Sequence, residues 1–288
     1  MGEGKALVDV CRRWRHIIFA SPQRLDLRLI CNSKTPARTS LDMWPPCPIV
    51  VYHWCSDVED EGEENVIAAL ERSDRVTKVT LNNLKRPASK KFTSVMTVPF
   101  PALKELRLWS ADHIGPFLPA TFLGESAPHL QLISLNGIAF RRTIRKLLSS
   151  ARHLSDLLLT DIPINCHIPP QDMVTCLSAS THLEYATIHF RPNRPHPSRK
   201  YRPPTSRAIL PALAHFRFEG DFKYMEDLVS RIAAPQLRDV QINLFDDEVP
   251  EFPQLREFIA LAVAGTLPPF GGHFVRKRPS GWLLYLYP

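Results

Sequence analysis

Seven segments of the chain share one pattern of apolar and polar positions. In each segment the first, fourth and sixth residues are apolar, with Ala186 the only small one, and most residues between them are polar. This alternation predicts short β-strands with one buried face. The segments are VTKVTL (76–81), LKELRL (103–108), LQLISL (130–135), LSDLLL (154–159), LEYATI (183–188), LAHFRF (213–218) and LRDVQI (237–242).

The segments recur at a nearly constant distance, which indicates a structural repeat. Their starts are separated by 27, 27, 24, 29, 30 and 24 residues. In four of them a proline stands two residues before the first apolar position, as in FPALKELRL and APHLQLISL. Proline suits the entry to a strand because its φ is compatible with extended backbone and its missing N–H is not needed there.

Five segments between the predicted strands are compatible with helices. One strand and its return segment cannot bury their apolar faces alone, whereas stacked copies form a continuous core. The spacing fits leucine-rich repeats, so we expect an α/β fold, a leucine-rich-repeat-like solenoid with a curved parallel sheet on the concave side and helices and loops outside. The predicted helical returns are 63–73, 141–151, 169–179, 224–234 and 252–263.

The expected solenoid is irregular, because such repeats often carry asparagine or cysteine eight residues after the first leucine and this chain does not. The residues at those positions are Leu84, Ala111, Ile138, Ile162, Arg191, Asp221 and Phe245.

The segments on either side of the repeats define the domain organisation. We expect a helix within residues 1–23, the solenoid over 24–263 and a divergent tail over 264–288. Residues 24–31 and 47–54 are predicted strands of an atypical first coil. The WLLYLYP end of the tail is either a capping strand or a segment that packs poorly.

The positive charge of the chain is concentrated in one segment. The net charge is +7, and the Pro/Arg-rich loop predicted at 191–207 carries six basic residues and no acid, which leaves about +1 (7 − 6) for the rest. A nucleic-acid-binding domain usually spreads its basic residues over a folded face, so this distribution argues against a nucleic-acid partner.

The cysteines and the hydropathy of the chain suggest its compartment. The six cysteines are widely and irregularly spaced, without a metal-binding pair, and are expected to be reduced core residues. We find no secretory signal pattern and no run of 18 apolar residues, so we predict no membrane partner and a cytoplasmic or nuclear protein.

The segment VCRRWRHIIFASPQRL (10–25) resembles the C-terminal part of an F-box, where a valine-cysteine pair, basic residues and a tryptophan on a helix precede a serine-proline turn. Over residues 6–263 the chain resembles the F-box and leucine-rich-repeat proteins abundant in mushroom-forming fungi. Only the last helix of the F-box is matched, so the motif is expected to be incomplete at its N-terminus. The resemblance implies a Skp1-like adaptor as one partner and an unknown protein target as the other.

Apolar residues of this predicted helix lie at spacings of three and four and form one stripe. They are the candidate adaptor-binding residues Leu7, Val10, Trp14, Ile17 and Ile18. Three interpretations stay open: the stripe caps the solenoid core, it retains an adaptor contact, or the basic residues around it form an electrostatic patch.

The residues between the apolar strand positions are expected to line the concave face, because side chains alternate along a strand. They mix both charge signs, amides and aromatic rings, a composition that suits protein recognition. The candidate target-binding residues are Arg107, Trp109, Tyr185, His189 and Arg217.

We predict neither catalytic residues, nor cofactors, nor metal ligands. The chain has no G-x-S-x-G, H-E-x-x-H or glycine-rich phosphate motif. The acidic FDDEVPEF (245–252) is expected to be solvated surface, and His189 and His215 lack a nucleophile. A hydrolase site in the C-terminal region would require a deep pocket.

These patterns favour a protein-protein interaction module over an enzyme. The resemblance implies the substrate-recognition subunit of an SCF-type ubiquitin ligase that binds its target on the repeat surface. The alternative is a leucine-rich-repeat scaffold without coupling to ubiquitination, because the F-box is truncated.

Overall fold

The computed structural model describes residues 28–43, 46–55, 62–112, 116–140, 143–163, 166–191, 207–245, 251–263, 272–278 and 281–287. Within them the chain is an α/β structure built on one eleven-stranded sheet in the order β1-β2-β3-β4-β5-β6-β7-β9-β11-β13-β12. The first nine strands in this order are parallel to their neighbours. The predicted α/β class is therefore confirmed.

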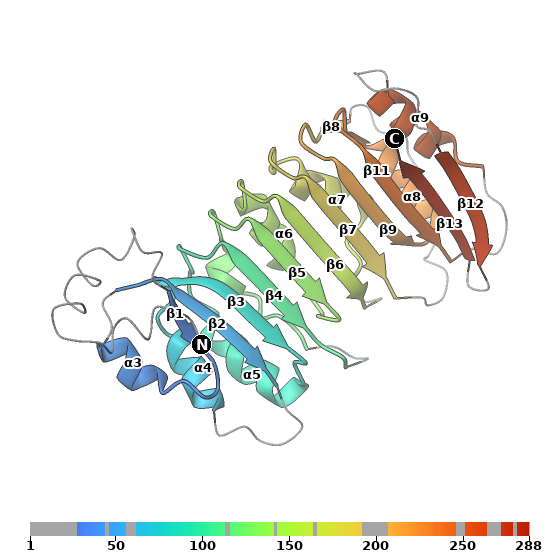
Figure 1. Ribbon diagram of the computed structural model, residues 1–288. Coiled ribbons are helices and arrows are strands. Elements are labelled where there is room, and N and C mark those ends of the chain that lie inside the picture. Colours follow the sequence, from blue (N-terminus) through green and yellow to red (C-terminus); the bar gives the residue numbers. More distant parts are fainter. Residues whose placement is uncertain are drawn as a thin grey trace.

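All seven repeat segments form strands of this sheet, side by side in chain order (Figure 1). The two predicted strands before them, at 24–31 and 47–54, are present too and join the same sheet. The parallel strands are β1 (Leu29–Cys31), β2 (Ile49–Trp54), β3 (Val76–Asn82), β4 (Glu105–Trp109), β5 (Leu132–Asn136), β6 (Asp156–Ile162), β7 (Tyr185–Phe190), β9 (His215–Gly220) and β11 (Asp239–Leu244).

The helices follow the strands and lie along one side of the sheet (Figure 1). The five predicted helical returns all contain a helix, and α3 and α5 are additional. Helix α5 escaped prediction because RPASKKFTSV has few apolar residues to reveal a helical period. The helices are α3 (Ala37–Met43), α4 (Glu63–Leu70), α5 (Arg86–Val95), α6 (Thr143–Ser150), α7 (Pro170–Leu177), α8 (Phe222–Ser230) and α9 (Pro253–Val263), with a 3₁₀ turn at Phe122–Glu125.

The core lies between the sheet and the helices. Strand residues alternate strictly here: Leu106 and Leu108 of β4 are buried, whereas Glu105, Arg107 and Trp109 are partly exposed. Neighbouring strands keep this register, so buried positions face buried positions across the sheet. Burial of such leucines and phenylalanines is the main stabilising contribution, at about 1.5–3 kcal/mol for each fully buried side chain.

The C-terminal tail forms two strands that pair with the sheet, as expected for a capping strand and not for a segment that packs poorly. Strand β13 (Gly281–Tyr287) pairs antiparallel with β11, and β12 (Gly272–Arg278) pairs antiparallel with β13. Residues 282–287 of the WLLYLYP segment therefore lie in a strand that extends the sheet past its parallel part. Two further short strands, β8 (Ala208–Ile209) and β10 (Ile232–Ala233), form a separate parallel pair.

Several predictions concern residues outside the described ranges. The helix within residues 1–23, its stripe of adaptor-binding candidates and most of the loop at 191–207 belong to this group. Arg191 and Arg207, the two ends of that loop, are described and both take part in ion pairs.

Candidate functional site

The sheet has one face that no helix covers in the described part of the chain, and we call it the open face (Figure 1). Strand pairing aligns its side chains in three rows that run across the strands. The first two rows are Val50, Lys78, Glu105, Leu132, Asp156, Tyr185, His215 and Asp239, and Tyr52, Thr80, Arg107, Ser134, Leu158, Thr187, Arg217 and Gln241. The third row consists of three paired stretches, Trp54 with Asn82, then Trp109, Asn136 and Thr160, then His189, Glu219 and Asn243, and the register shifts between β6 and β7.

Aromatic side chains gather at the β1–β4 end of the open face. The rings of Trp54 and Trp109 lie 5.5 Å apart between centroids at an angle of 51°. Trp54 is 54% exposed, Tyr52 on the same strand 48%, and Ile30 on β1 52%. Isolated exposed apolar residues are common, but a contiguous group of this kind marks interaction surfaces.

Sequence reasoning identified Trp109 in this group and missed Ile30, Tyr52 and Trp54. Their strands precede the first recognised repeat, so only strand pairing assigns them to the open face: Ile30 pairs with Val50, Tyr52 with Thr80 and Trp54 with Asn82. The signal in the sequence was the aromatic residues at alternate positions of IVVYHW.

A second group lies at the β7–β11 end. Tyr185 and His215 stack with parallel rings 4.4 Å apart between centroids. The Nδ1 of His215 lies 3.7 Å from a carboxylate oxygen of Asp239, and an Nη2 of Arg217 lies 4.0 Å from the same carboxylate. Asp239 of β11 therefore lies close to two side chains of β9.

His189 lies in the third row of the same end. Burial lowers the pKa of His189 below its ordinary value, and the charge of Arg217 lowers it as well, whereas the charge of Glu219 opposes both. His189 is paired in register with Glu219 on β9. It is thus a half-buried neutral side chain suited to hydrogen bonding.

The five predicted target-binding residues all lie on the open face, but they form two groups and not one. Arg107 and Trp109 are on β4, whereas Tyr185 and His189 are on β7 and Arg217 is on β9. Strands β5 and β6 separate the groups. At about 4.8 Å per strand, the two groups lie roughly 14 Å apart, so one partner has to span the sheet to touch both.

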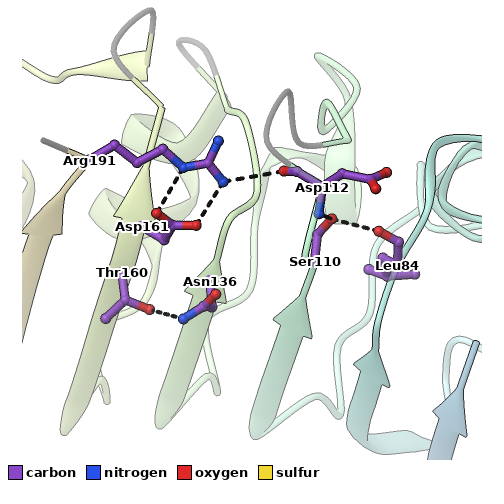
Figure 2. A network of polar contacts seen from close by, with 7 residues as sticks. All are labelled: Leu84, Ser110, Asp112, Asn136, Thr160, Asp161 and Arg191. Atoms are coloured by element: carbon purple, nitrogen blue, oxygen red, sulfur yellow. Dashed lines mark hydrogen bonds and ion pairs between the residues drawn. The ribbon is translucent and has the colours of Figure 1, made fainter. Parts of the chain in front are cut away.

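The edge where the strands end carries a network of polar contacts that fixes the strands relative to one another (Figure 2). Nε of Arg191 donates to Oδ1 of Asp161 at 2.8 Å and its Nη2 donates to Oδ2 at 2.7 Å. The same Nη2 donates to the backbone oxygen of Asp112 at 3.2 Å. One guanidinium therefore connects the ends of β4, β6 and β7.

Further side chains at this edge bond to the turn of the preceding unit. Nδ2 of Asn83 donates to the Cys55 oxygen at 2.9 Å, and Oγ of Ser110 donates to the Leu84 oxygen at 2.6 Å. Asn83 and Ser110 stand one position before Leu84 and Ala111, where the repeat pattern places asparagine or cysteine. The turn-bonding role is thus present in the chain, shifted by one residue.

Backbone conformation explains which residues occupy this position. Asn83, Gly137 and Asp161 stand at the same place in their units and have φ values of 55°, 66° and 54°. Asparagine, aspartate and glycine are the residues that adopt this left-handed region most readily. The edge is therefore a structural element that holds the open face in shape.

Three histidines form a row at the opposite edge, where the strands begin. The rings of His129 and His153, and those of His153 and His182, stack with centroids 6.0 Å apart. Among the described residues, no group of three histidines, cysteines or carboxylates is arranged to hold a metal ion. In the same part of the chain, no helix is long and apolar enough to cross a membrane.

Comparison with known proteins adds no further assignment. No protein-family model matches the chain, and no curated protein or solved structure matches it significantly.

Proposed function

We propose that the chain is a leucine-rich-repeat-like solenoid whose open face binds a protein target. The observation that carries this proposal is the aromatic group of the exposed Tyr52 and Trp54 and the partly exposed Trp109 on a sheet face that no described helix covers. Tryptophan, tyrosine and arginine are enriched among the residues that dominate protein-protein binding energies. A face built on paired strands is also preorganised, which lowers the entropic cost of binding.

The mechanism of such a module is recruitment. It holds the target near a second protein and so raises their effective concentration for each other. The resemblance to F-box proteins suggests that the second protein is a Skp1-like adaptor of an SCF-type ubiquitin ligase. The alternative is a scaffold with the same target-binding face and no link to ubiquitination.

Capture of purified Skp1 by the 288-residue chain separates these two forms of the proposal. Leu7→Asp with Trp14→Asp is the test variant, because it removes the apolar stripe. If the ligase form is right, the wild-type chain retains Skp1 and the variant does not. If neither retains it, and a chain extended through the upstream reading frame does not either, the scaffold form replaces it.

Peptide selection tests the open face itself. A random 16-residue library displayed on phage is selected on the immobilised chain, and the enriched phage are applied to a Trp54→Ala, Trp109→Ala variant. We expect the variant to lose most of them. Retention of all of them by the variant would show that the aromatic group is not the binding surface.

A further inference from the structure

Along β2 to β11, charged side chains are divided unequally over the open face. At the β2–β4 end it carries Lys78, Arg107 and Glu105, which gives a net charge of +1 (2 − 1). From β9 to β11 it carries Arg217 against the carboxylates of Glu219 and Asp239, which gives −1 (1 − 2), and β6 between the two ends adds the carboxylate of Asp156. Each sum covers the open-face rows only and treats histidine as neutral.

The positive end has one carboxylate shared by two cations. Nζ of Lys78 lies 2.6 Å from Oε2 of Glu105, and Nε of Arg107 lies 3.9 Å from the same oxygen. The closer pair leaves Arg107 only weakly compensated, on the same strand as the partly exposed Trp109, whose ring packs against the exposed ring of Trp54. This end thus offers an apolar surface next to a cation that a carboxylate of a partner can approach.

The negative end has the opposite arrangement. The carboxylate of Asp239 lies near both Arg217 and His215, at 4.0 and 3.7 Å, distances too long for strong hydrogen bonds. Glu219 lies one strand away from it, beside His189 in register. A lysine or arginine of a partner is therefore favoured over these strands.

The two ends are separated by β5, β6 and β7, of which only β6 carries an open-face charge, that of Asp156. Strand β5 contributes Leu132, Ser134 and Asn136, and β7 contributes Tyr185, Thr187 and His189. From β4 to β11 there are five neighbour steps. At about 4.8 Å each this is roughly 24 Å, the length of about seven extended residues or about 16 helical residues.

We propose that the target presents one segment with an apolar, acidic end that lies over β2–β4 and a basic end that lies over β9–β11. This inference rests on the proposed function and specifies the chemistry and the orientation of the partner. Complementary potentials of this kind determine orientation and association rate more than total affinity.

The phage-selected peptides test this proposal. The enriched sequences are expected to place aromatic or aliphatic residues with Asp or Glu at one end and Lys or Arg at the other, about seven residues away if they bind extended. A synthetic version of one such peptide is then measured by fluorescence polarisation against the wild-type chain and a Glu219→Lys, Asp239→Lys variant.

The charge-reversed variant is expected to bind this peptide about tenfold more weakly. It is also expected to prefer a second peptide in which only the basic end has been replaced by glutamates. The preference for the second peptide is the control for folding, because a misfolded variant loses both. The wild-type chain shows the opposite preference.

Other outcomes overturn the proposal. In one outcome, the Trp54→Ala, Trp109→Ala variant loses the peptides, but their acidic and basic residues have no fixed order and the Glu219→Lys, Asp239→Lys variant binds them as well as wild type does. The open face then binds proteins, and the inferred polarity is wrong. If the tryptophan variant retains them, the proposed function fails first. If the wild-type chain self-associates and the charge-reversed variant does not, the face is occupied by a second copy.

Discussion

Arg191 and Asp161 form a two-pronged ion pair across the edge where the strands end, with both nitrogen-to-oxygen distances under 3 Å. Only 13% of the Arg191 side chain is exposed, and the pair joins residues 30 positions apart in the sequence. Because the guanidinium also reaches the Asp112 backbone, the contact fixes the ends of strands that carry the open face.

Asp161→Ala is expected to lower the free energy of unfolding by about 2 kcal/mol, because it removes charge-assisted hydrogen bonds and leaves alanine at a left-handed φ. Asp161→Asn keeps one acceptor and tolerates this φ, so we expect a loss of about 1 kcal/mol. Urea denaturation measures both. Asp42→Ala, with a 77% exposed side chain, is the control and stays within about 0.5 kcal/mol of wild type. Equal stability of all three variants would contradict the role assigned to the pair.

Gly137→Ala is expected to cost more than the usual penalty for alanine at positive φ. A Cβ atom at this position would lie 2.3 Å from the backbone oxygen of Ser110, and φ is +66°. We therefore expect a loss of at least about 2 kcal/mol. Gly137→Asn separates the two causes, since asparagine tolerates the φ but meets the same oxygen. A fully stable Asn variant would show that the close approach does not matter.

Glu226 of α8 caps the start of α9. Its two carboxylate oxygens accept hydrogen bonds from the backbone N–H groups of Gln254 and Leu255, both at 3.0 Å. Glu226→Ala leaves both groups without this acceptor, and we expect a loss of about 1–3 kcal/mol in urea denaturation. A loss below the error of the measurement would contradict the cap.

The pH dependence of the Glu226 contribution has a defined sign. Burial raises the pKa of Glu226, and the two backbone hydrogen bonds only partly oppose this rise. Because the pKa of Glu226 is higher in the folded than in the unfolded state, its contribution to the free energy of unfolding is largest below the unfolded-state pKa of about 4.3. This contribution is lost as the pH rises through the folded-state pKa. The stability of wild type relative to Glu226→Gln should thus improve as the pH is lowered from 7 towards 4. A change in the opposite direction would mean that the folded pKa is lowered.

The repeat pattern predicted the strands well because each strand has one buried face. Leu106 and Leu108, or Ile133 and Leu135, are apolar for a reason that is local to the strand, and their period of two is visible in the sequence. The helices between the strands were harder to predict where they have few apolar residues, as in α5.

The candidate site was predictable only in part, since most of its features depend on pairing between distant segments. Trp109 was identified from its place in a repeat, whereas Trp54 became part of the same group through the register of β2 on β3. The Arg191–Asp161 pair depends on two turns that lie far apart in the sequence, and no local pattern indicates it.

The affinity of one selected peptide for three single variants tests the central claim most directly. Trp54→Ala and Trp109→Ala change the open face. Leu261→Ala is the control, because Leu261 is an apolar side chain of α9 that is 45% exposed, close to the 54% of Trp54. If the open face binds the target, each tryptophan variant raises the dissociation constant at least about tenfold, whereas Leu261→Ala leaves it within about twofold. A large effect of Leu261→Ala together with wild-type affinity in both tryptophan variants would contradict the account.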